Sequence, residues 1–250
     1  MDTQEALRRP DTLSSQEQEI DDAATIARDI ETLFRPRWHV AGHIDQLAAP
    51  GAYLTFALGD REAVIRRTAD GHVHAFYNVC PHRGSLLCEG RTGVASPRAI
   101  MCPYHGWTFE PADGALMKAP YMHDDFDLAG WRLYPVHADV WRGLVLVSFA
   151  DERPASLADA VDADALDGFD GSGWKLATFT SDDVPAAWRT VFESEGATGE
   201  SAHSWQPGST IVVGPDRVRV QVSRPTGAGT TVTDQYWLIR DEPTGREAGA

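Results

Sequence analysis

Short apolar runs fill the middle of the chain, from residue 38 to residue 149, and polar turn residues separate them. Gly, Asp and Pro mark the turns, for example at 59–60, 70–71 and 113–114. Short β-rich runs at this spacing predict a small antiparallel β-domain. The strands expected within it are Ala52–Leu58, Ala63–Arg67, His72–Tyr77, Trp107–Glu110, Leu133–His137 and Leu144–Phe149.

A helix is expected ahead of this β-rich region. Residues 1–13 have the polar composition of a disordered tail, and Ser14 or Ser15 then offers an N-cap at the spacing of a capping box. Apolar residues recur on one helical face as far as about Leu33, and Pro36 ends the pattern. The positions on that face are Ile20, Ala24, Ala27, Ile30 and Phe34.

A second unit follows an acidic segment at 151–173 that is rich in Ala, Asp and Gly. We expect this segment to be a linker with one short helix, for which Ser156 is a possible cap. Beyond it, Val184–Ser194 has a helical pattern and the remaining apolar runs favour strands. Those strands are Trp174–Thr180, Ile211–Val213, Val218–Val222 and Thr230–Ile239. The expected fold class is therefore α+β.

The predicted units are a tail and helix at 1–37, a β-domain at 38–150 and an α+β unit at 151–250. The net charge of −15 argues against nucleic acid and anionic membranes as partners, because both attract basic surfaces. The chain has no run of about 18 apolar residues, so no transmembrane helix is expected. The polar N-terminus also lacks the pattern of a signal peptide. Three Cys do not make a disulfide framework, so we expect a cytoplasmic protein.

Two short segments carry the candidate chemistry. Residues 80–84 read Cys-Pro-His-Arg-Gly, and residues 102–107 read Cys-Pro-Tyr-His-Gly-Trp. Two thiolates and two imidazoles can bind zinc or an iron–sulfur cluster, and a third possibility is buried Cys and His without metal. A structural zinc finger of this composition usually pairs Cys with Cys and His with His, whereas each Gly/Pro-rich segment here supplies one of each. We therefore predict a 2Fe–2S cluster with both Cys on one iron and both His on the other. Its predicted ligands are Cys80, His82, Cys102 and His105.

The neighbours of these ligands fit a cluster site. Gly84 and Gly106 come after the His ligands, and glycine lets backbone N–H groups approach the sulfides, where hydrogen bonds tune the potential. Tyr104 and Trp107 are expected either to cover the cluster or to be ordinary core aromatics. Cys88 is expected to be a small buried residue and not a ligand.

The region from Trp38 to about Phe149 resembles the Rieske domain in the large (alpha) subunit of ring-hydroxylating, non-haem iron oxygenases. It does not resemble the respiratory-complex type, which has an additional Cys in each loop, joined as a disulfide. Position 104 is Tyr here, and Cys88 has no partner in the second loop. Two His in place of two Cys raise the potential to roughly −150 to +300 mV, and without the disulfide we expect the low end. The matching pieces are the two ligand segments, Trp38–His43, Pro50–Tyr53, Asn78–Val79, Asp113–Gly114 and Trp141–Gly143.

The same resemblance implies a second metal site, which this sequence matches poorly. In the family a mononuclear iron, bound by two His of one helix and a later carboxylate, activates O2. Here His203 is the only His in the unit at 151–250. Glu200 and His203 have the acid-to-His spacing and are the candidate catalytic residues, while nothing singles out the later Asp234 or Asp241. We therefore expect that this chain does not build the Fe(II) site alone.

Three functions remain open at this point. The first is an oxidoreductase subunit that takes electrons from a reductase or ferredoxin and passes them to the mononuclear iron of a partner. The resemblance implies that this partner is a full-length homologue in a trimer-based hetero-oligomer, and that the isolated chain is not catalytically competent. The second is a complete terminal oxygenase that hydroxylates or demethylates an organic substrate with O2. The third is a non-enzymatic redox-sensing or regulatory module. The incomplete ligand set favours the first.

Overall fold

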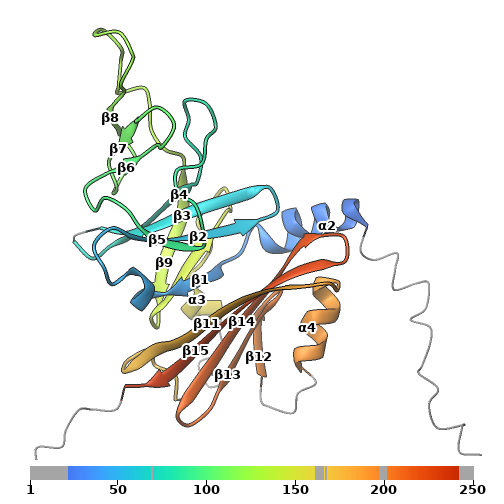
Figure 1. Ribbon diagram of the computed structural model, residues 1–250. Coiled ribbons are helices and arrows are strands. Elements are labelled where there is room, and N and C mark those ends of the chain that lie inside the picture. The colour runs from blue at the N-terminus through green and yellow to red at the C-terminus, as the bar shows by residue number, and fades with distance from the viewer. Residues whose placement is uncertain (1–21, 69, 161–165, 167, 197–201, 242–250) are drawn as a thin grey trace, which may run out of the picture.

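The computed structural model describes residues 22–68, 70–160, 166, 168–196 and 202–241. Its strands form three antiparallel sheets, which confirms the expected α+β class with a large β content. A sheet of three short strands lies at the upper end of Figure 1, a seven-stranded sheet in the middle and a five-stranded sheet at the lower end.

The seven-stranded sheet has the order β1-β10-β9-β4-β3-β2-β5. Tight turns connect its hairpins at places where the sequence predicts them. Leu58 pairs with Arg61, so Gly59 and Asp60 form a two-residue turn in which Gly59 has a φ of +61°. The strands are β1 (His39–His43), β2 (Ala52–Leu58), β3 (Arg61–Arg67), β4 (Val73–Tyr77), β5 (Thr92–Val94), β9 (Pro135–Trp141) and β10 (Leu144–Ser148).

The other two sheets differ greatly in strand length. The three-stranded sheet comprises β6 (Ile100–Met101), β7 (Thr108–Phe109) and β8 (Leu116–Lys118). The five-stranded sheet has the order β11-β15-β14-β13-β12. Its strands are β11 (Trp174–Val184), β12 (Ala202–Gln206), β13 (Ser209–Val213), β14 (Arg217–Gly227) and β15 (Thr230–Arg240).

Few helices accompany the sheets. None of those in the described ranges has the length and apolar character that crossing a membrane requires. Helix α4 packs against the five-stranded sheet, and the indole of Trp188 in α4 donates to the Asp29 carboxylate in α2 (3.1 Å). The helices are α2 (Ala23–Asp29), which continues as a π-helical turn η2 (Ile30–Phe34), the 3-10 helix η3 (Ile44–Leu47), α3 (Leu157–Ala160) and α4 (Trp188–Gly196).

One apolar core lies between the seven-stranded and five-stranded sheets, so the units predicted at 38–150 and 151–250 share an interior. Trp38, Leu144 and Leu146 pack there against residues of β13, β14 and β15. The acidic segment at 151–173 also contributes, since Leu166 and Phe169 are buried in this core. That segment is therefore more than a linker, although its short helix α3 forms as predicted and Ser156 Oγ accepts from the N–H of Ala158 (3.2 Å).

A buried carboxylate forms an ion pair across the same interface. Asp234 in β15 is fully buried and accepts from Arg91, which precedes β5, and from Arg224 in β14, each at 2.6 Å. Ser181 in β11 donates to the other carboxylate oxygen at 2.6 Å. A buried carboxylate needs such partners, because leaving it unpaired in the interior is costly. Asp234 therefore ties the two sheets together.

Several predicted boundaries are wrong. The helix expected from Ser14 or Ser15 lies partly outside the described residues, and the described helix begins at Ala23 because Asp22, in an extended conformation, caps it (2.7 Å). Val184 ends strand β11 and does not begin a helix, since Pro185 interrupts the chain before α4. Strand β9 begins two residues later than predicted and continues to Trp141. The strand Ala52–Leu58 is confirmed as predicted.

Candidate metal centre

The two ligand segments occupy loops at the upper end of the molecule, and their backbones form the same turn. In the first loop, which follows β4, the N–H of Cys80 donates to Ser85 and the N–H of Gly84 donates back to Cys80 (2.8 and 2.9 Å). In the second loop, between β6 and β7, the N–H of Cys102 donates to Trp107 and that of Gly106 to Cys102 (2.8 and 3.0 Å). The glycine stands four residues after the cysteine in both loops.

Each of these turns requires its glycine for conformation. Gly84 has a φ of +73° and Gly106 a φ of +69°, in the left-handed region that other residues rarely adopt. A side chain at Gly84 would have free space, so the constraint there is the backbone angle and not crowding. The two turns are equivalent, but the spacing from Cys to His differs. Counted from the cysteine, His82 is the third residue of its turn and His105 is the fourth residue of the other.

The loops bring the four predicted ligands together. Cys80 and Cys102 are buried free thiols, and the Ser85 hydroxyl lies 3.2 Å from the Cys102 sulfur. The imidazoles of His82 and His105 are half-buried neighbours, with ring centroids 4.8 Å apart. One pair of ligands is therefore inside the domain and the other reaches toward its surface.

The electrostatics of the thiols show backbone N–H groups directed at sulfur. Burial raises the pKa of Cys80 to about 11, against the effect of the N–H groups of His82 and Arg83. Burial acts in the same direction on Cys102, but hydrogen bonds from Ser85 and from the N–H groups of His105 and Tyr104 outweigh it and lower its pKa. Such donors also suit the sulfurs of an iron–sulfur cluster, where they tune its potential.

Two observations test whether these residues fit a 2Fe–2S cluster. The Nδ1 atom of His82 is buried and has no hydrogen-bond partner, so it is available to bind a metal. No three Cys, His, Asp or Glu side chains in the described ranges gather closely enough to hold a single metal ion. A zinc ion would need four ligands around one point, whereas a dinuclear cluster separates its ligands into two pairs. The residues therefore fit the cluster.

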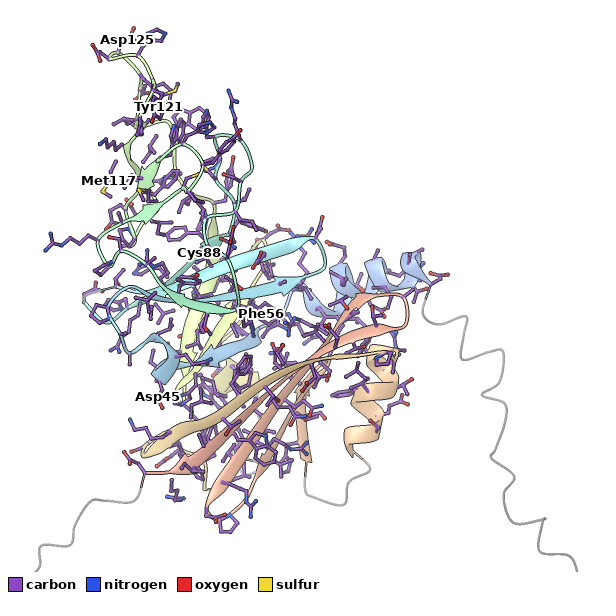
Figure 2. The ribbon with its side chains drawn as sticks, in the orientation of Figure 1. Asp45, Phe56, Cys88, Met117, Tyr121 and Asp125 are labelled. Carbon is purple, nitrogen blue, oxygen red and sulfur yellow. The ribbon has the colours of Figure 1, made fainter. Side chains whose placement is uncertain are left out.

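Aromatic side chains surround the ligands. Trp107 is fully buried, and its indole stacks on the ring of His82, while Tyr104 is 62% exposed and contacts the ring of His105. Tyr104 and Trp107 thus differ in burial, although the sequence analysis gave the same two alternatives for both. Farther out, Figure 2 shows Met117, Tyr121 and Asp125 along the outermost end of the molecule, and Tyr121 is 91% exposed.

Among the described residues, no group of three or more His, Cys, Asp or Glu side chains forms a mononuclear metal site. Glu200 lies outside the described residues. His203 belongs to strand β12, where it pairs with Ile211. Directly paired residues point to the same face of a sheet, and Ile211 is buried in the core shared with the seven-stranded sheet. Asp234 is held by two arginines.

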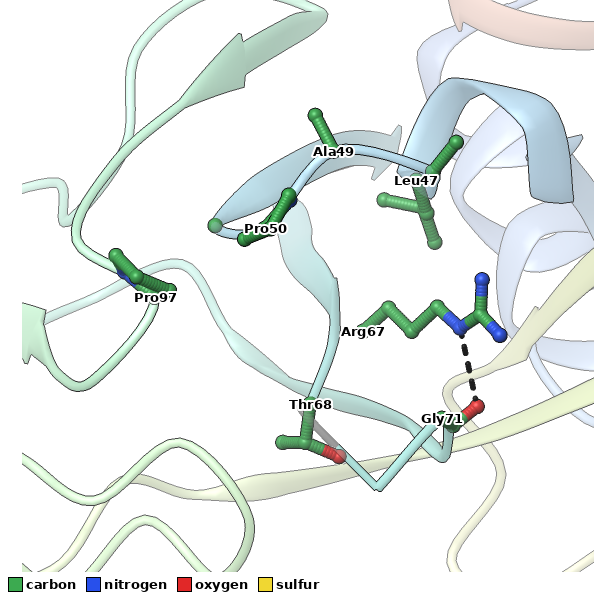
Figure 3. Close-up of a pocket in the computed structure, with 9 residues that line it drawn as sticks. Leu47, Ala49, Pro50, Arg67, Thr68, Gly71 and Pro97 are labelled. Atoms are coloured by element: carbon green, nitrogen blue, oxygen red, sulfur yellow. Dashed lines mark hydrogen bonds between the residues drawn. The ribbon is translucent and has the colours of Figure 1, made fainter.

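Neither the remaining cysteine nor a separate pocket belongs to the predicted ligand set, although Cys88 lies in the same buried cluster as Cys80 and Cys102. Cys88 is buried, and burial raises its pKa to about 11, as expected for a small core residue. A cavity of about 280 Å³ lies beside η3 and the end of β3, where Arg67 is the one ionisable residue among the described residues that line it (Figure 3). The Arg67 Nε donates to the Gly71 carbonyl (3.3 Å). This pocket contains neither Cys nor His.

Comparisons with known proteins agree with this site. Residues 37–137 match the family described as the Rieske [2Fe-2S] domain. The chain is 33% identical over 168 residues to the glycine betaine monooxygenase oxygenase subunit of Pseudomonas aeruginosa, an alignment that covers 66% of this chain and 38% of that protein. It is 40% identical over 128 residues to the chloroplastic choline monooxygenase of Amaranthus tricolor, covering 51% of this chain and 28% of that protein. The chain thus spans well under half the length of these relatives.

Solved structures share the fold of this protein over most of the chain, including the five-stranded sheet. The apo form of the quaternary ammonium Rieske monooxygenase CntA superposes with a TM-score of 0.71 at 24% identity, covering 92% of this chain and 76% of that chain. Naphthalene 1,2-dioxygenase with indole bound superposes with a TM-score of 0.72 at 19% identity, covering 91% and 72%. At these identities the likeness shows the fold. Residues 37–137 therefore form a Rieske [2Fe-2S] domain, and the chain is similar in sequence to the oxygenase subunit of glycine betaine monooxygenase and in fold to a Rieske monooxygenase.

Proposed function

We propose that this chain is the 2Fe–2S subunit of a Rieske oxygenase system, with Cys80, His82, Cys102 and His105 as the cluster ligands. The observation that carries the proposal is the pair of equivalent loops that bring two buried thiols and two adjacent imidazoles to one end of the molecule. When bound, the cluster would accept one electron from a reductase or ferredoxin and release it to an acceptor.

The chain's own residues prepare the site for this exchange. The buried thiols and the N–H groups of the two loops hold the inner side of the site, away from water. The half-buried imidazoles of His82 and His105 form its outer side, so the distance from the site to a docked partner is short. A proton at the outward nitrogen of either ring can reach solvent, which suits electron transfer coupled to proton transfer.

The electron acceptor we propose is a mononuclear non-haem iron on a partner subunit. The support is that the second unit offers few side chains that could bind an iron. Its single His lies on β12 and is on the side of the sheet that faces the shared core. The buried Asp234 carboxylate already forms ion pairs with Arg91 and Arg224. One solved relative is described as giving insights into inter-subunit electron transfer, and the glycine betaine and carnitine monooxygenase relatives are named oxygenase subunits. A full-length homologue in a mixed oligomer would provide such an iron.

A second candidate is a complete oxygenase that acts on a quaternary ammonium compound. The observation that favours it is the similarity to relatives named glycine betaine, choline and carnitine monooxygenases. Incubation of the purified chain with a reductant and each of these three compounds, with O2 uptake as the measurement, tests it. Turnover by the chain alone would replace the first candidate, whereas turnover only after a full-length homologue is added would support it.

The deciding experiment is the ratio of iron to acid-labile sulfide in protein purified anaerobically and offered excess Fe(II). We expect two irons for two sulfides. Three irons for two sulfides, with the third lost in His203→Ala, would establish a mononuclear site in this chain and overturn the proposal of a partner iron. Protein that binds neither sulfide nor two irons would contradict the cluster assignment itself.

A further inference from the structure

The two proposed histidine ligands stand in different surroundings. The ring of His82 lies flat on the indole of Trp107, with centroids 4.4 Å apart and an angle of 1° between the planes. The ring of His105 contacts the exposed Tyr104, at 3.8 Å and 34°. One imidazole therefore rests on a fully buried side chain, and the other on a side chain that faces solvent.

Trp107 is held from its other sides by aromatic rings. Trp131 meets it edge-on, with centroids 5.0 Å apart and planes at 88°, and Phe126 lies 5.7 Å away. Phe109 in β7 completes this group at 6.4 Å. We call Trp107, Phe109, Phe126 and Trp131 the aromatic box. Edge-to-face contacts of this kind add stability beyond the burial of area, so the indole has one well-defined orientation.

Two sides of the aromatic box come from the segment between β8 and β9. Local hydrogen bonds close this segment: the N–H of Phe126 donates to His123 (3.0 Å), and the N–H of Trp131 donates to Leu128 (3.1 Å). The N–H of Leu116 in β8 also donates to Trp131 (3.0 Å). The rings that hold Trp107 are thus fixed to their own backbone and to the sheet.

Trp107 also links the two ligand loops. Its carbonyl accepts from the N–H of Cys102 and closes the second loop, while its indole supports the histidine of the first loop. A residue in this position constrains the orientation of His82 relative to Cys102. It also shields one face of the imidazole from water.

We propose that Trp107 is a positioning residue for the cluster, which fixes the plane of the His82 ring and keeps that side of the site dry, so that the reduction potential is held low. This rests on the proposed assignment of His82 as a ligand. Reduction makes the cluster one charge more negative, and a low-dielectric surrounding disfavours added charge. Opening the box to water therefore raises the potential. Phe126 and Trp131 act one step further away, through the indole.

A merely structural role for Trp107 would give a different result. In that case its loss would lower stability as the loss of any buried tryptophan does, and the potential would not change. Trp174 is the matched control: it is buried to a similar extent, its indole nitrogen also lacks a partner, and it lies in the five-stranded sheet. Trp174→Leu removes as much apolar surface without touching the ligand loops.

The test is the reduction potential and the EPR spectrum of the reduced full chain in four variants. We expect Trp107→Leu to raise the potential and shift the g values, and Trp131→Leu to do both to a smaller extent. Trp107→Phe, which keeps a flat ring, should show the smallest change of these three variants. Trp174→Leu should match wild type in both. If Trp107→Leu does not retain the cluster, the other three variants provide the test. Their reduction potentials should then be highest in Trp131→Leu, intermediate in Trp107→Phe and lowest in Trp174→Leu.

The outcomes separate this proposal from the ligand assignment. An intact Rieske spectrum with an unchanged potential in Trp107→Leu and Trp131→Leu would overturn the positioning role while leaving the ligands untouched. A shift in Trp174→Leu as large as that in Trp107→Leu would overturn it too, because the effect would then be unspecific. A wild-type spectrum without nitrogen hyperfine coupling to a histidine would overturn the assignment of His82.

Discussion

At the cluster end of this protein the strands are two or three residues long and the ligands lie in loops. At the opposite end β11, β14 and β15 each have 11 residues and pair along nearly their whole length. The two ends also treat charge differently. The cluster end gathers two thiols and two imidazoles that a metal can bind, whereas the five-stranded sheet buries Asp234 between two arginines.

This contrast separates the parts that carry out chemistry from the parts that support it. Ligands on loops can take the spacing that a cluster needs, because a loop is not bound to the regular repeat of a strand. Such loops have few backbone hydrogen bonds of their own, so the surrounding structure must hold them. Arg91, just beyond the first ligand loop, contacts Asp234 of the five-stranded sheet and so connects the two ends.

The largest expected effect is the loss of one proposed ligand. Cys102→Ser should strongly reduce bound sulfide and the visible spectrum of the cluster, because a serine oxygen is a much weaker ligand for the cluster iron than a thiolate. Cys88→Ser is the control, since Cys88 is buried outside the ligand loops, and it should retain two irons for two sulfides. Full iron and sulfide in Cys102→Ser would remove the assignment.

Breaking the buried ion pairs should have the next largest effect, at the opposite end. Asp234→Asn leaves Arg91 and Arg224 without their carboxylate, which typically costs about 3–5 kcal/mol. Chemical unfolding measures the loss. Asp241→Asn, at an exposed position after β15, should change the free energy of unfolding by less than about 0.5 kcal/mol. Equal stability of both variants would show that Asp234 does not hold the ends together.

A histidine between the two ends should make stability depend on pH. His39 is fully buried between Phe34 and Phe56, and desolvation lowers its pKa to about 4. The unfolded chain, with a His pKa of about 6.5, binds the proton more readily, so folding loses stability as the pH falls from about 6.5 to about 4. The loss should approach about 3 kcal/mol and should be absent in His39→Gln. A pH profile of unfolding that is the same in both proteins would contradict it.

The smallest expected effect concerns the turn of the first ligand loop. Gly84→Ala should cost about 1–2 kcal/mol, because alanine is strained at a φ of +73° even though its side chain would have space. Gly173→Ala provides the control: Gly173 has a φ of +66° and equally free space but lies next to the five-stranded sheet. Both should lose similar stability, and Gly84→Ala alone should shift the reduction potential.

Most of the longer strands could be predicted, and the misses have physical causes. Strand β1 is buried on both faces and therefore shows no alternation, and β6 is two residues long, too short for a period. The ends of β11 and α4 were misjudged because Val184, an apolar residue, suits both a strand and a helix. Only Pro185, together with pairing of Val184 with Thr231, decides for the strand.

The sequence by itself predicted the ligand set and indicated the kind of metal centre, because ligand chemistry and spacing within a loop are local properties. It also determined that glycines end both ligand turns. The tertiary structure alone decided that Asp234 joins two sheets, that His203 faces a buried core and that Trp107 stacks on His82. Each of these depends on which segments meet in space, and the pattern of neighbouring residues carries no information about contacts between distant parts of the chain.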